Sequence, residues 1–384
     1  MENTASANAT SSSEKYSISA YQYFSVILFS GLFGINLYPT LLTAEINRNW
    51  LAAQILSILC AVASIALVLF LFKKTGAKSF RDLCRMVLGE KAGSVLLWLI
   101  GIHLISSSVV IPTIQIESIT AYVMRLTPLV VIMGLFVLCA VVMVQKGRFQ
   151  ISKTAEIFCP IVIMISLVLL IIMTSSINPL ELRVLMQPDE DGFFLQFINS
   201  FSSFSSIELI FFFMGDLKFK EKREKTTFIA VALLSVLLLT MFICETGIYT
   251  IDGISHIASP TIEMLRIVNI KNVSFFEHGS TFLAGVKIVN NTLFLSIMMY
   301  CIYSCFSKKD YSKTFPKSSW LYGAFVVAGM LFVYKFNLMK PLKQMIVYSQ
   351  MGILFVVVPL LLIIFIIRGF SKKGKEAKTN AQTN

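Results

Sequence analysis

Residues 18–44 read ISAYQYFSVILFSGLFGINLYPTLLTA, and this stretch decides the class of fold. It exceeds the roughly 20 apolar residues that a helix needs to cross the hydrocarbon of a bilayer. Gly31, Gly34 and Pro39 lie where a continuous membrane helix would normally avoid them. We therefore predict a transmembrane helix that unwinds between Ser30 and Pro39.

Backbone groups freed by such a break need polar partners inside the membrane. A polar ligand or an ion is a natural partner for them. The alternative is that Gly31 and Gly34 let another helix pack closely, while Pro39 makes a tolerated kink.

A serine-rich stretch predicts a second interruption, five spans later. Residues 200–206 read SFSSFSS and are followed by Ile207 and Glu208. Serine hydroxyls compete for backbone hydrogen bonds and can open a helix. The alternative is a serine-lined packing face between helices. Interruptions at corresponding places in two halves of a chain indicate an inverted-repeat transporter fold with a site at the membrane midplane.

The rest of the chain supports a membrane protein without a separate soluble domain. Of its 384 residues 56% are apolar and 14% are charged, whereas soluble domains carry about 25% charged residues. Mean hydropathy is +0.77. We predict an all-α protein with ten transmembrane helices in one domain, residues 15–368, built from repeats at about 15–174 and 193–368, with a disordered tail before it and a basic tail at 369–384. The predicted spans are residues 18–44, 50–72, 94–124, 128–145, 152–174, 193–215, 226–250, 276–306, 318–335 and 343–368.

The distribution of basic residues predicts the orientation. With both termini in the cytoplasm, 24 Lys and Arg residues lie inside and 8 lie outside, which is a strong positive-inside bias. Amphipathic stretches at residues 79–88 and 260–270 predict two short helices along the membrane surfaces.

Composition also excludes several classes of function. The net charge of +12 is spread between apolar segments and forms no clustered basic face, so nucleic-acid binding is not expected. The seven cysteines form no CxxC pair, which argues against a disulfide framework or a zinc site. No metal-ligand spacing, phosphate-binding loop or nucleophile–base arrangement is present, so we expect neither a cofactor nor enzymatic activity.

The eighth predicted span places polar residues on one helical face at membrane depth. Lys287, Asn290 and Asn291 are spaced i, i+3 and i+4, with Ser280 two turns earlier on the same side. A charge at that depth costs at least about 2.5–3.5 kcal/mol on insertion scales, so Lys287 needs a partner. We predict that Glu208 is this partner in a coupling site. A structural ion pair without a ligand role is the alternative.

Further polar residues occur in the third, seventh and eighth spans. Ser107 and Ser108 belong to a polar outer half of the third span, which lines a ligand path or makes helix-to-helix hydrogen bonds. His103, one turn earlier, is more often a satisfied structural residue than a proton relay. Glu245 and Glu277 are expected near the outer surface, where a carboxylate reaches water.

Several segments together resemble the B subunit of bacterial spore germinant receptors, a branch of the amino acid–polyamine–organocation transporter superfamily. Residues 16–22 are similar to the start of that family, and they precede the glycine-interrupted helix ending at Pro39. Trp50, the loop at 76–93 and the stretch at 147–160 match in order and spacing. The resemblance extends over about residues 15–368.

One part of the eighth span departs from the family pattern. The family commonly has a glutamate–arginine–x–acid motif at the start of this span and a tryptophan further along. Here residues 277–280 read EHGS, and Lys287 stands where the tryptophan is expected. The superfamily places a cation between the first and eighth helices, and the Lys287 ammonium is a possible replacement for it.

The resemblance implies a LeuT-type fold with broken helices 1 and 6 and a role in sensing a germinant. The protein is then expected in the spore inner membrane, working with an A-type subunit and a C-type lipoprotein subunit. Its ligand is expected to be a small germinant, most simply an amino acid, whose carboxylate meets backbone N–H groups freed in the first helix. The ligand-binding residues predicted in this way are Gly31, Gly34, Ile35, Ser107, Ser108, Phe204, Ser205, Ser206, Asn290 and Asn291.

Two other functions remain open at this point. One is a proton- or sodium-coupled amino acid transporter of the same fold. The other is a scaffold or ion-conducting subunit that binds no small ligand. Uptake into vesicles distinguishes the first from a receptor, and ligand-dependent thermal stabilisation argues against the second.

Overall fold

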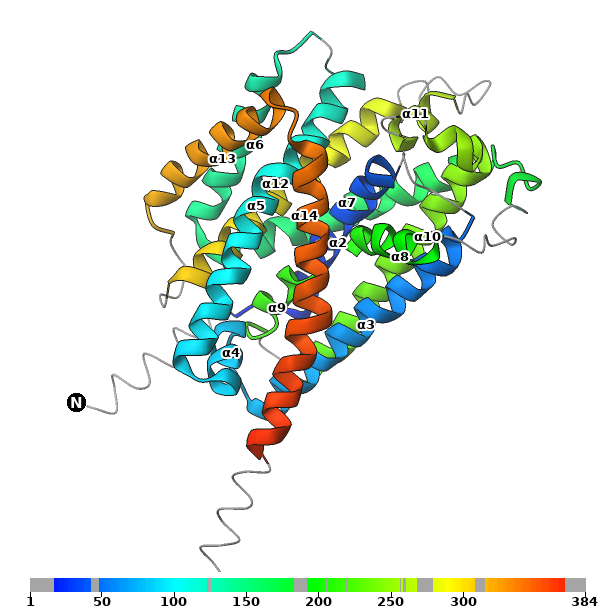
Figure 1. Ribbon diagram of the computed structural model, residues 1–384. Coiled ribbons are helices and arrows are strands. Elements are labelled where there is room, and N and C mark those ends of the chain that lie inside the picture. The colour runs from blue at the N-terminus through cyan, green and yellow to red at the C-terminus, as the bar shows by residue number, and fades with distance from the viewer. Residues whose placement is uncertain are drawn as a thin grey trace, which may run out of the picture.

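The described part of the chain is helical throughout. A computed structural model describes residues 17–42, 48–122, 124, 126–182, 192–204, 206–217, 220–255, 257, 260–267, 279–307 and 315–369 (Figure 1). The first half contains α2 (Ala20–Leu42), α3 (Trp50–Thr75), α4 (Phe80–Leu88), α5 (Glu90–Tyr122), α6 (Leu129–Gln145) and α7 (Gly147–Thr174). The second half contains α8 (Phe193–Phe201), α9 (Leu209–Phe213), α10 (Arg223–Ser255), α11 (Pro260–Ile267), α12 (Gly279–Phe306), α13 (Ser318–Lys335) and α14 (Met339–Met351). Helix α14 continues through a π-helical stretch, Gly352–Val357, to residue 369.

Six of the described helices are long and apolar enough to cross a membrane. They are α3, α5, α7, α10, α12 and the helix that begins with α14. Each of them coincides with a predicted span, and α2 and α6 supply shorter apolar stretches. The predicted count of ten spans and the division into two inverted repeats stay predictions.

The predicted break in the first span is wrong. Helix α2 is unbroken from Ala20 to Leu42, so its backbone N–H and C=O groups pair within the helix, as an apolar environment demands. Gly31 serves close packing instead. A methyl group built at Gly31 would collide with the Leu234 side chain of α10. The close-packing alternative therefore describes this glycine better than unwinding does.

The predicted break in the sixth span is confirmed. Helix α8 ends at Phe201, a single 3-10 turn covers Ser202–Phe204, and α9 begins only at Leu209. Serine hydroxyls take part in the interruption, since Ser203 Oγ donates to the carbonyl of Ser200 at 2.7 Å. This span is therefore split into two short helices in the middle of the protein.

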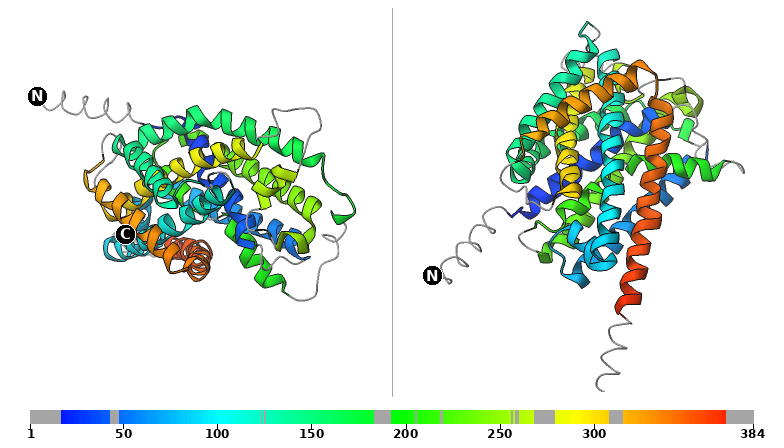
Figure 2. Two further views of the ribbon diagram at one scale, coloured as in Figure 1. Left: turned by 90° about the horizontal axis from the view of Figure 1, so that it is seen from above. Right: turned by 60° about the vertical axis from the view of Figure 1, so that its left-hand side comes forward.

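Helices α2 and α12 lie inside the bundle and position this break. Helix α2 packs against α7, α10, α12 and the turn between α8 and α9, and α12 packs against α5, α6 and α7. Viewed from above in Figure 2, α2 is surrounded by other helices. Of the six long apolar helices, α12 is the most buried.

Both short amphipathic stretches form helices. Ser79 begins α4, because its Oγ accepts a hydrogen bond from the Asp82 backbone N–H at 3.1 Å. The ring of Phe80 then packs on Phe211 and Phe212 of α9, with ring centres 5.5 and 5.1 Å away. The second stretch forms α11, and the predicted residues 268–270 lie outside the described part of the chain.

Candidate functional site

The interruption between α8 and α9 is held in a strained, tightly turned conformation. Ser206 has a φ of 76°, in the left-handed region that side chains other than glycine rarely adopt. Short turns satisfy part of the backbone, with the Ile207 N–H donating to the Phe204 carbonyl at 3.0 Å and the Leu209 N–H donating to the Ser206 carbonyl at 3.1 Å. Such outliers persist where the surrounding structure enforces them, often at functional sites.

Buried polar side chains from α5 and the α14 helix hold the break on one side. Glu208 is 1% exposed, and its Oε1 lies 3.3 Å from His103 Nε2. Gln350 Nε2 donates to Glu208 Oε2 at 3.3 Å and also to the carbonyl of Phe204. On the far side of the ring, His103 Nδ1 lies 2.6 Å from Ser349 Oγ. The break is thereby tied to two neighbouring helices by one polar network.

Helix α3 also holds the break. Gln54 is buried, and its Nε2 donates to Ser203 Oγ at 3.0 Å. Ser57, one turn further along α3, donates to the carbonyl of Phe197 in α8 at 3.4 Å. Ser57 of α3 and Gln350 of the α14 helix therefore each bond a backbone carbonyl next to the break, and the other contacts join side chains.

The predicted pair of Glu208 with Lys287 is wrong. Glu208 pairs with His103 instead, and no salt bridge joins Glu208 to Lys287. The sequence placed both acid and base at membrane depth but could not fix the rotation of their helices. The sequence offers little indication of the role of His103, which contacts Glu208 beside the break and is not a lone histidine.

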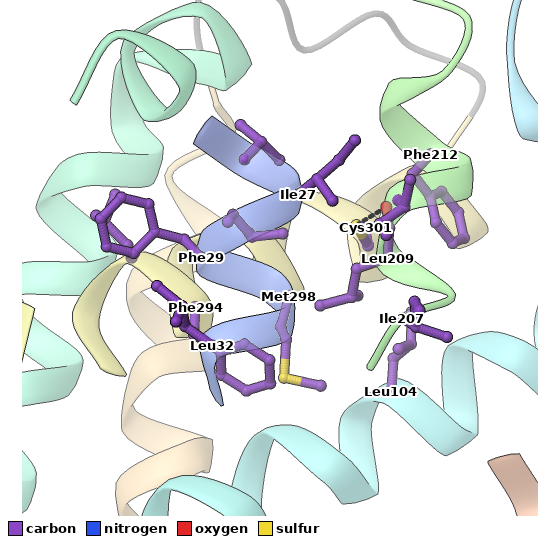
Figure 3. Packing of buried hydrophobic residues seen from close by; sticks show 14 of the residues in the cluster. Ile27, Phe29, Leu32, Leu104, Ile207, Leu209, Phe212, Phe294, Met298 and Cys301 are labelled. Carbon is purple, nitrogen blue, oxygen red and sulfur yellow. Dashed lines mark hydrogen bonds between the residues drawn. The ribbon is translucent and has the colours of Figure 1, made fainter. Parts of the chain in front are cut away.

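The space beside the break is closed by apolar side chains. Figure 3 shows Leu104 of α5, Ile207 of the break, Leu32 of α2 and Met298 of α12 gathered in one cluster, and all four are buried. Cys301 Sγ faces the carbonyl of Leu209 at 3.9 Å. Apolar side chains of α2, α5 and α12 therefore pack beside the break.

Of the two predicted serines in α5, one is structural and one is free. Ser108 Oγ donates to the Ile105 carbonyl and lies 2.7 Å from the hydroxyl of Tyr322, so it joins α5 to α13. Ser107 is fully buried, and its hydroxyl has no hydrogen-bond partner among the described residues. Ser206 Oγ is also buried and has no hydrogen-bond partner among the described residues.

The polar face of α12 is buried and largely unsatisfied. Lys287, Asn290 and Asn291 are each at most 2% exposed. Within the described residues, Lys287 Nζ, both polar side-chain atoms of Asn290 and Asn291 Nδ2 have no hydrogen-bond partner. Residues of α2, α7, α10 and α12 line a cavity of about 50 Å³, and Asn290 and Leu32 contribute to its wall.

The expected position of Glu245 near water is also wrong. Glu245 is fully buried in α10, where its Oε1 accepts a hydrogen bond from Thr261 of α11 at 2.7 Å. Its Oε2 has no partner in the described structure. No salt bridge joins Glu245 to Lys287 among the described residues.

Some predicted site residues fall where side chains are not described. Gly34 and Ile35 lie within the continuous helix α2, and only their backbone is described. Ser205 and Glu277 lie outside the described residues, and the same holds for the side chain of Ser280.

A polar cluster closes the end of the bundle that we predict to be cytoplasmic. Arg148 of α7 forms a salt bridge with Asp216, with Nη1 2.7 Å from Oδ1. The Tyr300 hydroxyl of α12 donates to Asp216 Oδ2 at 3.4 Å. The backbone N–H of Ile18, just before α2, donates to the Asp216 carbonyl at 3.0 Å. Asp216, which follows α9, therefore joins α7, α12 and the residues just before α2.

Together these features define a helical membrane protein with a transporter-like core, in which a discontinuous helix crosses the middle of the bundle. The solved structure of a Na⁺-coupled sialic acid symporter in its substrate-bound, outward-open state has the same fold, with a TM-score of 0.54 and 11% sequence identity. The match covers 90% of this chain and 76% of the symporter.

The family follows from the sequence comparisons. The profile of a family described as spore germination protein matches residues 17–336. Spore germination protein B2 of Bacillus subtilis (strain 168) is 21% identical over 235 residues, which cover 61% of this chain and 63% of that relative. The aligned part thus spans less than two thirds of the relative's length. The chain belongs to the spore germination protein family.

The left-handed Ser206 gives a first test of the break. Replacing Ser206 with glycine is expected to leave stability within about 1 kcal/mol of wild type, because glycine adopts positive φ without a steric cost. Ser206→Val is expected to cost about 1–3 kcal/mol, because a β-branched residue is strained there. Thermal unfolding in detergent measures both. Ser304 in helix α12 is the control, and Ser304→Gly should be destabilising there. If Ser206→Gly destabilised the protein as much as Ser304→Gly does, the backbone at Ser206 would not be strained.

Proposed function

We propose that this chain is the membrane-embedded, ligand-sensing subunit of a spore germinant receptor and that it performs no enzymatic reaction. Its ligand is a small nutrient, most simply an amino acid. The observation that carries this proposal is the broken helix between α8 and α9, which lies at the junction of α2, α5 and α12 in a transporter fold. A membrane helix is interrupted inside a bundle chiefly where a polar ligand or ion uses the break.

The proposal extends to the location and the partners of the protein. We place it in the inner membrane of the spore with both termini in the cytoplasm, consistent with 24 basic residues inside and 8 outside. An A-type subunit and a C-type lipoprotein subunit are its proposed partners. The resemblance of the chain to germinant receptor B subunits supports this assembly.

Ligand binding acts by favouring one of two arrangements of the bundle. The bias cannot exceed the difference between the ligand's affinities for the two arrangements. In the arrangement described here, Asp216 joins Arg148, Tyr300 and the start of α2 below the break. We propose that a ligand at the break changes how α8 and α9 meet α2 and α12, and that Asp216 carries this change to the cytoplasmic end.

Ile207 provides the test of this site, because it is 1% exposed and belongs to the break. Spores carrying Ile207→Ala are expected to need at least about tenfold more amino acid for half-maximal germination, which corresponds to a loss of about 1.4 kcal/mol in binding. The decrease in optical density of spore suspensions measures the response, and immunoblots of spore membranes verify the protein level.

Ile363 is the matched control, because it is 52% exposed in the last helix. The Ile363→Ala spores should germinate as wild type does. A wild-type response in Ile207→Ala spores with normal protein level would remove the ligand from the break.

The second candidate function is a working amino acid transporter, and the fold shared with a sodium-coupled symporter favours it. Uptake of labelled amino acids into proteoliposomes that contain the purified chain, driven by an imposed proton or sodium gradient, distinguishes the two. A receptor is expected to show no gradient-driven accumulation above protein-free vesicles. Accumulation that collapses when the gradient is dissipated would assign transport instead.

A further inference from the structure

The buried face of α12 presents donors without acceptors. Lys287 Nζ, Asn290 Nδ2 and Asn291 Nδ2 have no hydrogen-bond partner in the described structure, and all three residues are at least 98% buried. Their spacing of i, i+3 and i+4 places them side by side along one helix. Buried donors are normally satisfied, and a buried ammonium group most of all, so a group of three needs a specific explanation.

The unbroken first helix makes these donors more significant. A ligand carboxylate was expected to meet backbone N–H groups freed around Gly31, but those groups are paired within α2. The carboxylate therefore needs donors from elsewhere in the core. Among the described residues that line or adjoin the cavity between α2, α7, α10 and α12, α12 supplies both a positive charge and free amide N–H groups.

A buried acid lies in α10, about one helical turn from Met241, which lines the same cavity as Asn290. Glu245 of α10 is fully buried, and Thr261 occupies only its Oε1. Its Oε2 has no hydrogen-bond partner within the described chain, and no salt bridge joins Glu245 to Lys287 among the described residues. An acid and a base held near one another without contact suit a ligand that carries both charges.

The polar face is continuous with the apolar region beside the break. Asn290 and Leu32 line the same cavity, and Leu32 also packs in the cluster that contains Ile207 and Met298. Asn291 is one helical turn from Phe294, which belongs to that cluster. A small ligand with a charged head on α12 would thus extend its side chain toward the break.

We propose that Lys287, Asn290, Asn291 and Glu245 form the head-group subsite for a zwitterionic α-amino acid. Lys287 Nζ and the amide N–H groups of Asn290 and Asn291 bind the carboxylate. Glu245 Oε2 and Asn290 Oδ1 accept from the ammonium group. The inference rests on the proposed sensing function and adds the ligand's charge pattern and the residues that read it.

The test uses the purified full chain in detergent and measures thermal unfolding with each of the twenty protein amino acids. At least one amino acid is expected to raise the Tm of the wild type, because a ligand that prefers the folded state stabilises it. The α-amide of that amino acid, which lacks the carboxylate, and its N-acetyl derivative, which lacks the ammonium group, are expected to bind at least tenfold more weakly.

Two variants assign the effect to α12. Lys287→Met and Asn291→Leu keep side-chain bulk and are each expected to weaken amino acid binding at least tenfold. Lys335→Met, at an exposed position in α13, is the matched control and should bind as wild type does. The Tm without ligand shows whether each variant folds, and Asn291→Leu keeps the test valid if Lys287→Met does not.

The outcomes separate the subsite from the proposed function. Equal amino acid binding by wild type, Lys287→Met and Asn291→Leu would overturn the subsite and leave the sensing role intact. Stabilisation by sodium chloride but by no amino acid would assign the site to an inorganic anion and overturn the proposal. If binding of an amino acid depends on Lys287 but spores do not germinate in response to that amino acid, the subsite would stand and the sensing role would be refuted.

Discussion

Replacing Glu208 with alanine is expected to destabilise the protein by about 3 kcal/mol, because it removes two hydrogen bonds from a buried network and leaves buried polar groups unpaired. The carboxylate contacts His103 Nε2 and Gln350 Nε2, both at 3.3 Å, at the start of α9. Its loss leaves His103 Nε2 without this partner and removes one of the two acceptors of Gln350 Nε2, so the break loses its link to α5 and keeps only the Phe204 carbonyl as its bond to Gln350. Thermal unfolding in detergent measures the change.

The variants Glu208→Gln and Glu221→Ala supply the controls. Glutamine keeps the length of the side chain and one acceptor oxygen, so a smaller loss of about 1–2 kcal/mol is expected. Glu221 is exposed, and its removal should change stability by less than about 0.5 kcal/mol. If Glu208→Ala unfolded at the same temperature as Glu221→Ala, the network would not hold the break.

A double-mutant cycle identifies the partner of Glu208. If His103 and Glu208 act together, the combined loss for His103→Ala and Glu208→Ala is expected to be smaller than the sum of the single losses, by about 0.5–3 kcal/mol. Additive losses would show that the 3.3 Å contact between them contributes nothing.

The helical class of the fold follows from local sequence, and its long-range pairings do not. Apolar runs long enough to span a bilayer predict α3, α5, α7, α10 and α12 directly, since only helices satisfy their backbone in lipid. The serine-rich run at 200–206 also predicts its own interruption, because serine competes for backbone hydrogen bonds locally.

Glycine is ambiguous in the same environment, which explains the error in α2. A glycine in a membrane helix either weakens it or lets a neighbour approach closely, and the two roles look alike in one sequence. Gly31 contacts Leu234, which is about two hundred positions away, so only the packing reveals its role.

A single sequence similarly does not show which residues pair with its buried charged side chains. Glu208, Glu245 and Lys287 were each recognisable as polar residues in apolar runs, but their helix rotations decide which of them meet. The structure places Glu208 with His103 and Glu245 with Thr261. The i, i+3, i+4 spacing did predict that Lys287, Asn290 and Asn291 share one face of α12, but not that Lys287 has no hydrogen-bond partner among the described residues.

The contact between the end of the broken helix and the loop before α4 carries the other large expected effect. Gly215 follows α9, and a methyl group built there would collide with the backbone carbonyl of Lys78 and lie 3.1 Å from Ser79 Cα. These backbone atoms cannot move aside as a flexible side chain would, because Ser79 begins α4 and Phe80 is packed on Phe211. Gly215→Ala is therefore expected to cost about 3 kcal/mol or more.

Gly134 in α6 is the matched control for this substitution, because a methyl group built there meets no atom within 4 Å. Gly134→Ala should leave stability unchanged or raise it by up to about 1 kcal/mol, since alanine favours the helix. Protein level in membranes and thermal unfolding in detergent compare the two variants. If both accumulated and unfolded alike, α9 would not be held against Lys78, and a change at the break would have no rigid route to α4.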